Sequence, residues 1–248
     1  EFFKFVLINF YAYLLAKKLD LSSFLFFLFW PTLLILLQPD FGSLMILIAS
    51  SFILYFLAGG RMKVLSILFS VGFCLALLVV LLSPYRRERL ITFLTPGQNT
   101  LGDAYHVHQI TLALGSGSWF GRGIGNSQQK YSYVPEASSD SIFAIVAEEI
   151  GFVGALSIIM LFALYFLVAN LMIKNQALSA YEHLLYYGIL AWIAVQLLFN
   201  LAAVVVLLPL SGMPLPFFSQ GGSALLISFF ASGILLSIAR HAKLKNKK

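Results

Sequence analysis

The sequence predicts an all-α membrane protein that crosses the bilayer several times. Of its 248 residues, 60% are hydrophobic and only 10% are charged, whereas a soluble domain carries about 25% charged residues. The mean hydropathy is +0.91. The apolar residues form long runs and do not alternate with polar ones, as they would in a transmembrane β-barrel. Because helices satisfy their own backbone in lipid, we expect one all-helical membrane domain over 1–248.

Seven apolar runs approach the length of about 20 residues that a helix needs to cross a bilayer. They are 2–16, 22–37, 41–59, 64–82, 141–169, 184–208 and 220–239. The first two are short, and the last is interrupted by Ser and Gly. The sequence begins with Glu rather than Met, directly before an apolar run and without a signal-peptide pattern. This start is typical of a chain cut in mid-protein, so we expect further segments before it.

The distribution of Lys and Arg predicts the orientation of the helices. Alternate connections at 17–20, 60–63 and 170–183 hold two, two and one basic residues, and the C-terminal tail holds five. The opposite short connections hold none. We therefore place the tail in the cytoplasm and the long connection 83–140 outside, as an extracytoplasmic loop.

The extracytoplasmic loop is rich in glycine, aromatic and amide residues, as in "ALGSGSWFGRGIGNSQQKYSYVPEA". Glycine permits tight turns and close approach of two backbones, and unstructured loops of this length are usually functional. The loop lacks the Gly-Lys-Ser/Thr ending of a phosphate-binding P-loop. We expect "YHVHQITLALG" (105–115) to form a short re-entrant or interfacial helix.

Basic residues also lie in this loop, although Lys and Arg usually concentrate in cytoplasmic connections. Three of them stand in "SPYRRERL". A guanidinium group donates two parallel hydrogen bonds to phosphate, which predicts an anion site at the outer surface. The alternative is a solvated loop start in which an arginine pairs with Glu88. The candidates for anion binding are Arg86, Arg87, Arg89, Arg122 and Lys130.

Four carboxylates stand at the mouth of an apolar run in "VPEASSDSIFAIVAEEIG" (134–151). One of the two serines before Asp140 is expected to cap the helix, which places Asp140 in its first turn. An acid there is either part of a functional site or a charge that the helix N-terminus stabilises. Glu148 and Glu149 lie about 12–13 Å deeper. They are either functional or pair with basic residues or water to hold the helix bundle together.

Other polar residues within the apolar runs have structural interpretations. Glu1 and Lys4 are three apart, which predicts an ion pair on one helical face. "LLQPDFGS" places Asp40 at a turn. Gln196 and Asn200 are four apart and are expected to join helices rather than contact substrate.

Two further segments bear on the site. "LLPLSGMPLPFFSQGGSALL" (207–226) contains three prolines and three glycines, and we expect it to form a re-entrant or pore-lining edge. His106 and His108 have no Cys or HExxH partner, so no fixed metal site is predicted.

Four motifs together resemble the SEDS family of membrane proteins, which includes RodA, FtsW and the sporulation paralogue SpoVE. They are "LLQPDFGS", "YRRERLITFLTPGQ", "GSGSWFGRGIGNSQQKYSYVPEASSDSIFAIVAEEIGFVGA" and "LLPLSGMPLPFFSQGGSALL", in family order. The opening "EFFK" resembles the end of the family's Gln-Pro-Ser-Glu-x-x-Lys element. Members of the family usually have ten membrane helices. The resemblance therefore implies that the seven predicted here are the fourth to the tenth and that the first three are absent.

The resemblance implies a peptidoglycan glycosyltransferase that joins lipid II into glycan strands outside the cytoplasmic membrane, in cell elongation or division. The family's essential aspartate maps onto Asp140, and the glutamate before it maps onto Glu136. Its arginine-rich loop start maps onto 86–89. Further candidates for substrate contacts in these motifs are Gln128, Ser219 and Gln220. The sequence departs from the usual family pattern at His106, Ser138, Ser139, Ser141 and Gln220.

The implied reaction inverts the donor sugar, so it needs a base and positive charge beside the departing pyrophosphate. Asp140 is the expected base. No tightly bound cofactor is expected, although a transient divalent cation could share the charge. The implied partners are lipid II, membrane lipids and a class B penicillin-binding protein, with no nucleic acid. Two alternatives remain: a lipid II flippase or transporter, whose broken helices line a pathway, and a non-catalytic scaffold of the cell-wall synthesis complex.

Overall fold

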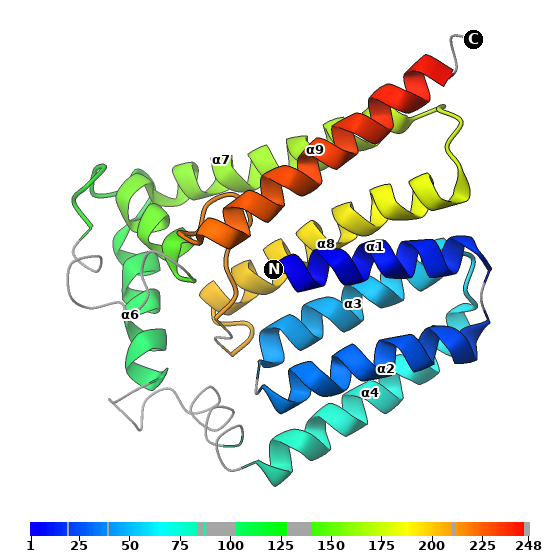
Figure 1. The fold of residues 1–248 in the computed structure, drawn as a ribbon. Helices are drawn as coiled ribbons and strands as arrows, with labels where there is room; N and C mark the ends of the chain where they lie inside the picture. Colours follow the sequence, from blue (N-terminus) through cyan, green and yellow to red (C-terminus); the bar gives the residue numbers. More distant parts are fainter. Residues whose placement is uncertain are drawn as a thin grey trace. The chain divides into compact units, whose positions relative to one another are not determined.

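The computed structural model describes residues 1–18, 20–38, 40–83, 87, 103–127, 140–209 and 212–245. In these ranges all regular secondary structure is helical (Figure 1). The helices are α1 (Phe2–Ala16), α2 (Leu21–Leu37), α3 (Phe41–Leu57), α4 (Met62–Leu82), α6 (Asp103–Ser116), α7 (Ile142–Ile173), α8 (Ala180–Val204) and α9 (Gly222–Lys245).

Each of the seven predicted apolar runs forms a helix, and the predicted short helix in the long loop is α6. Helices α7, α8 and α9 are long and apolar enough to cross a membrane, while α1, α2, α3 and the stretch Met62–Cys74 of α4 are shorter apolar helices. These helices and the structural relatives given below confirm the prediction of an all-α polytopic membrane protein.

Helix α8 begins four residues before the predicted start at 184 because a capping box forms there. The N–H of Ser179 donates to Oε2 of Glu182 at 2.8 Å, and the N–H of Glu182 donates to the hydroxyl oxygen of Ser179 at 3.2 Å. Such reciprocal bonds satisfy backbone donors that a helix start leaves open. The cap thus extends the helix beyond its apolar run.

The chain forms two compact units. Unit 1 comprises Glu1–Gly60, Met160–Leu198 and Pro216–Lys248, and unit 2 comprises Arg61–Ile159 and Phe199–Leu215. Helix α7 therefore starts in unit 2 and ends in unit 1, whereas α8 starts in unit 1 and ends in unit 2. Each unit is described by itself below.

The core of unit 1 is built around α1, which packs against α2, α3 and α9 (Figure 1). The ring of Phe5 lies 6.2 Å from that of Trp192 on α8 and 5.7 Å from that of Phe230 on α9. The ring of Tyr11 lies 5.7 Å from that of Phe24 on α2. Aromatic rings, all of them buried except that of Phe230, thus connect helices that are distant in sequence.

Three polar residues of unit 1 have structural roles, and Glu1 and Lys4 form the ion pair that their spacing predicts. Nζ of Lys4 lies 2.5 Å from Oε1 of Glu1, and both side chains are largely buried. Asp40 caps α3, because its carboxylate accepts a hydrogen bond from the N–H of Ser43 at 3.0 Å. These contacts stabilise the helices.

Candidate functional site

Asp140 lies in unit 2, immediately before α7. The carbonyl of Ser141 accepts hydrogen bonds from the N–H groups of Ala144 at 2.9 Å and Ile145 at 3.3 Å, so Ser141 is the residue from which the helix starts. The prediction that Asp140 lies within the first helical turn is therefore wrong. Asp140 instead precedes that turn and is half-buried.

Asn200 of α8 holds the backbone at this point. Its side-chain amide donates to the carbonyl of Asp140 at 3.0 Å and to the carbonyl of Met213 at 2.6 Å. The side chain of Asn200 is buried. It thus joins the start of α7 to the segment after α8, which is the connecting role that the sequence predicts for it.

Gly212 lies directly beside the Asp140 carboxylate. Its φ of +66° falls in the left-handed region, and a Cβ added there would lie 3.3 Å from Oδ2 of Asp140. Glycine adopts this backbone conformation readily. The absence of a side chain at this position therefore leaves the carboxylate its space.

His106 joins α6 to the start of α7. Its Nε2 lies 3.0 Å from the hydroxyl oxygen of Ser141, and Ser141 is fully buried. Both residues are positions at which the sequence departs from the family pattern. No fixed metal site is predicted at His106, and its contact with Ser141 instead links it to the residue that follows Asp140.

Helix α7 is broken at Gly151, where φ is +72° and ψ is −173°. A broken helix leaves backbone groups that need other partners, above all in a membrane protein. The N–H groups of Arg122 and Gly123 supply two of them, donating to the carbonyls of Glu148 at 3.0 Å and Glu149 at 2.9 Å. The glycine-rich segment 117–125 thus docks into the break.

The residues after the break complete this docking. The N–H of Phe152 donates to the carbonyl of Ser118 at 2.9 Å, and the N–H of Val153 donates to that of Trp119 at 3.2 Å. The approach requires glycine, because a Cβ at Gly121 would lie only 2.2 Å from the Glu149 carbonyl oxygen. The glycines predicted to permit close approach therefore join a loop to the helix that starts beside Asp140.

Glu148 lies at the centre of this docking site and is fully buried. The hydroxyl of Ser127 donates to its Oε2 at 2.6 Å, and Nη1 of Arg122 lies 3.8 Å from its Oε1. This is the pairing with a basic residue that one reading of the sequence predicts. Glu149, its neighbour, is half-buried. The role of Ser127 could not be predicted from the sequence, because one serine among many carries no local signal.

The ion pair with Glu148 leaves part of the Arg122 guanidinium exposed. Its side chain is 38% exposed, whereas that of Glu148 is not exposed at all. A planar guanidinium has five N–H donors, so it can pair with Glu148 and still present donors to an anion. Arg122 remains a candidate for binding phosphate.

The other predicted substrate residues are less closely defined. Arg87 is exposed. In unit 1, Ser219 is buried and Gln220 is exposed. Their roles stay predictions. The remaining candidates lie outside the described residues: Arg86, Glu88, Arg89, Gln128, Lys130 and Glu136.

No group of three or more His, Cys, Asp or Glu side chains that could hold a metal ion occurs in the part of the chain that the structure describes. The expectation of a transient divalent cation stays a prediction.

Comparison with protein families identifies relatives along nearly the whole chain. The family model for FtsW, RodA and SpoVE, described as "Cell cycle protein", matches residues 1–244. The chain is 40% identical over 217 residues to the "Probable peptidoglycan glycosyltransferase FtsW" of Pseudoalteromonas translucida, a match that covers 87% of this chain and 54% of that protein. It is 35% identical over 251 residues to the "Stage V sporulation protein E" of Bacillus subtilis, covering 98% and 68% respectively. The chain thus spans about half to two thirds of the length of these relatives.

Solved structures share the fold. A chain from a structure described as "Structural coordination of polymerization and crosslinking by a peptidoglycan synthase complex" matches with a TM-score of 0.75 and 25% identity. The match covers 96% of this chain and 70% of that one. A mutant of the rod shape determining protein RodA from Thermus thermophilus matches with a TM-score of 0.65 and 21% identity, over 96% of this chain and 64% of that one. The latter likeness bears on the fold alone.

Proposed function

This chain belongs to the cell cycle protein family of FtsW, RodA and SpoVE, and on that premise we propose that it is a peptidoglycan glycosyltransferase. It polymerises lipid II into glycan strands at the outer face of the cytoplasmic membrane. The observation that carries the proposal is the position of Asp140. The carboxylate that matches the family's essential aspartate lies beside Gly212, and its backbone is held by Asn200.

The proposed reaction is a single displacement at the anomeric carbon of the donor sugar. The acceptor's 4-hydroxyl oxygen forms the new bond to that carbon, while the bond from the carbon to the pyrophosphate oxygen breaks with its electron pair. Asp140 accepts the proton of the hydroxyl as general base. The α-linked donor thereby becomes a β-linked product, and undecaprenyl pyrophosphate leaves.

The departing pyrophosphate gains negative charge, which basic side chains stabilise. Arg122 is the described candidate whose surroundings fit this role. The Glu148 carboxylate and the docked glycine-rich segment hold its backbone and guanidinium, while its exposed part stays open to an anion. Arg87 is a second candidate, and it is exposed.

The proposed setting is the bacterial cytoplasmic membrane, with the C-terminus in the cytoplasm. The basic residues of the alternate connections and the tail support this orientation. We propose a class B penicillin-binding protein as partner, in a complex that also crosslinks the new strands. Support comes from the relative solved in a peptidoglycan synthase complex.

The test separates polymerisation from transport. The purified protein is placed in liposomes with fluorescent lipid II, and two products are followed in parallel: glycan strands by gel electrophoresis, and lipid II that has changed leaflet by dithionite quenching. The proposal predicts that glycan strands form from lipid II in the leaflet on the same side as the extracytoplasmic loop. Leaflet exchange without any strand formation would favour a flippase and contradict the proposal.

A further inference from the structure

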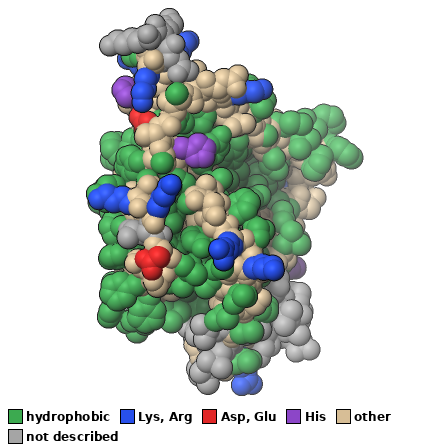
Figure 2. Space-filling model, turned by 90° about the vertical axis from the view of Figure 1, so that its right-hand side faces the viewer, with side chains coloured by type: hydrophobic (Ala, Val, Ile, Leu, Met, Phe, Trp, Pro, Cys, Tyr) green, Lys and Arg blue, Asp and Glu red, His purple; other side chains and the backbone are tan. Residues whose placement is uncertain are grey.

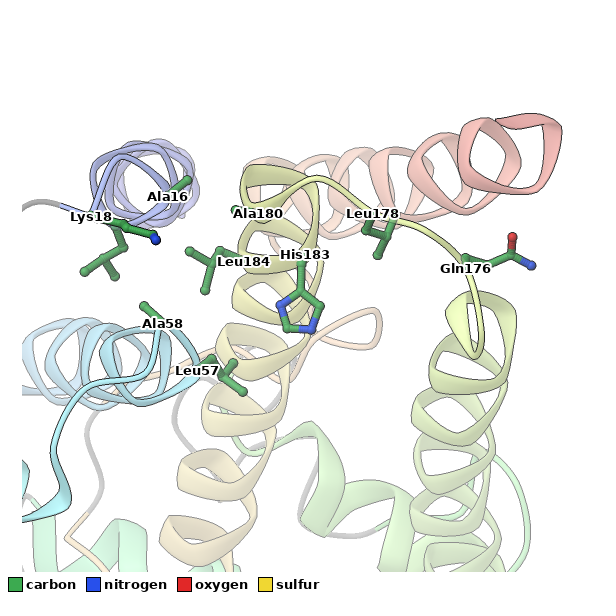
Figure 3. A pocket seen from close by; sticks show the side chains of 10 residues that line it. Ala16, Lys18, Leu57, Ala58, Gln176, Leu178, Ala180, His183 and Leu184 are labelled. Carbon is green, nitrogen blue, oxygen red and sulfur yellow. The ribbon is translucent and has the colours of Figure 1, made fainter. Parts of the chain in front are cut away.

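Unit 1 contains a cavity of about 460 Å³ at the end where α1 and α3 finish and α8 begins (Figure 3). The connection between α7 and α8 contributes Gln176 to its lining. All of its walls belong to unit 1, so the cavity is distinct from the residues around Asp140 in unit 2. It is therefore a candidate for a second binding site.

The lining is amphipathic. Lys18 reaches from the end of α1 toward α8, and His183 projects from the second turn of α8 (Figure 3). Aliphatic side chains complete the walls, among them Leu15, Leu57 and Leu184. None of the ten lining residues carries a carboxylate. Such a lining suits a ligand with a negative head and an apolar body.

Lys18 has a left-handed backbone conformation, which decides which substitutions suit this position. Its φ is +54°, in the left-handed region, and its N–H donates to the carbonyl of Leu15 at 3.0 Å. Glycine and asparagine adopt this conformation more readily than lysine.

The acids near this end of unit 1 have partners of their own. The carboxylate of Asp20 accepts hydrogen bonds from the hydroxyls of Ser22 and Ser23, which lower the pKa of Asp20 below its ordinary value. Oε1 of Glu182 lies 3.3 Å from Nδ1 of His241. Within the described residues no ion pair joins Lys18 to an acid. Its charge therefore remains available to a ligand.

Further basic residues lie in the connections and helix ends of unit 1, outside the cavity lining. Unit 1 carries Lys17, Lys174, Arg240, Lys243 and Lys245 in the same connections and in the last turns of α9. On the face that Figure 2 shows, Lys and Arg side chains are scattered among hydrophobic and other residues, and few Asp or Glu side chains are visible. Basic residues near a membrane surface attract its anionic lipids in general, and basic pockets between membrane helices bind lipid headgroups.

We propose that this cavity binds the phosphate headgroup of an anionic phospholipid. The ammonium of Lys18 and the imidazole of His183 contact the phosphate oxygens. One acyl chain lies against Leu15, Leu57 and Leu184. The site would couple the protein to the composition of the membrane leaflet on its basic side, which is independent of the polymerase reaction proposed for unit 2.

The experiment measures which lipid stays with the protein. The protein is purified in a nonionic detergent and exchanged with equal amounts of phosphatidylglycerol and phosphatidylcholine of matched acyl chains, and bound lipid is counted by native mass spectrometry. We expect wild type to retain phosphatidylglycerol preferentially. Lys18→Asn suits the left-handed backbone but removes the charge, so it should lower this retention about fivefold. Lys18→Arg should restore it.

Three controls keep the result specific. Lys243→Gln removes a charge from α9 but not from the cavity lining, and it should leave the preference unchanged. His183→Gln should weaken retention in the same direction as Lys18→Asn. Inorganic phosphate at the same concentration should not displace the lipid. Equal retention of both lipids by wild type, an equal loss in Lys243→Gln and Lys18→Asn, or full displacement by inorganic phosphate would overturn the proposal.

Discussion

The imidazole of His106 lies 3.0 Å from the hydroxyl oxygen of Ser141 and so ties α6 to the residue that follows Asp140. A neutral hydrogen bond contributes about 1 kcal/mol, which corresponds to roughly fivefold in a rate. If the bond positions Asp140, His106→Ala and Ser141→Ala should each lower kcat by about that factor with little change in KM. The double variant should be no slower than either single one. Additive losses in the double variant would show that the two residues act separately.

Gly212 should be sensitive because of its contact with the Asp140 carboxylate. Gly212→Ala adds a Cβ 3.3 Å from Oδ2 at a φ of +66°, so the carboxylate must move by a few tenths of an ångström. We expect kcat for strand synthesis to fall about tenfold, since small displacements of reacting groups lower rates strongly.

Gly59→Ala is the matched control for this effect. Gly59 also has a positive φ, of +88°, but a Cβ there would meet no atom within 4 Å. Both variants carry the left-handed strain of about 1–2 kcal/mol, whereas only Gly212→Ala crowds Asp140. An equal effect of the two variants on kcat would mean that crowding of the carboxylate is unimportant.

The docking of the glycine-rich segment into the break of α7 predicts a contrast between two other glycines. Gly121 and Gly125 have φ values of +78° and +83°, so alanine strains both by about 1–2 kcal/mol. Only Gly121 faces backbone, with the Glu149 carbonyl oxygen 2.2 Å from an added Cβ. Gly121→Ala should therefore also break the backbone hydrogen bonds of the docked segment, each worth about 1–3 kcal/mol when its groups are left unsatisfied. Thermal unfolding in detergent should show a clearly larger destabilisation for Gly121→Ala, and equal melting temperatures would contradict the docked geometry.

The buried carboxylate of Glu148 predicts a stability effect at Ser127. Ser127→Ala removes the donor that lies 2.6 Å from Oε2 of Glu148, and hydrogen bonds to charged groups contribute about 1.5–3 kcal/mol. In the Glu148→Gln background the same serine substitution should have a smaller effect on the free energy of unfolding. Ser157→Ala, whose hydroxyl is exposed and bonds only within its own helix, is the control and should be nearly neutral. An undiminished effect of Ser127→Ala in the Glu148→Gln background would contradict the pairing.

The helices could be predicted closely because their signal is local. Apolar runs of the right length mark α1 to α4 and α7 to α9, and their composition is enough to indicate a membrane protein. The helix ends are harder to predict from sequence: one of the two serines before Asp140 was expected to cap α7, but the helix starts from the backbone carbonyl of Ser141.

The candidate site depends on contacts between distant residues, which the sequence does not reveal. Gly212 and Asp140 approach each other although they are far apart in the chain. The break at Gly151 depends on backbone hydrogen bonds from segment 117–125, which the sequence of α7 does not indicate. Asn200 was predicted to join helices because a polar residue in an apolar helix needs a partner. Which carbonyls it would meet could not be predicted.

The role of Asp140 as general base is tested most directly by polymerisation of lipid II in liposomes by Asp140→Asn. Asparagine keeps the size of the side chain but cannot accept the acceptor's proton. Asp40→Asn is the matched control, because it also removes a carboxylate, while asparagine caps α3 about as well as aspartate. We predict that Asp140→Asn loses at least about a hundredfold in the rate of strand synthesis at an unchanged melting temperature, and that Asp40→Asn retains the wild-type rate. Strand synthesis by Asp140→Asn at the wild-type rate would contradict this role.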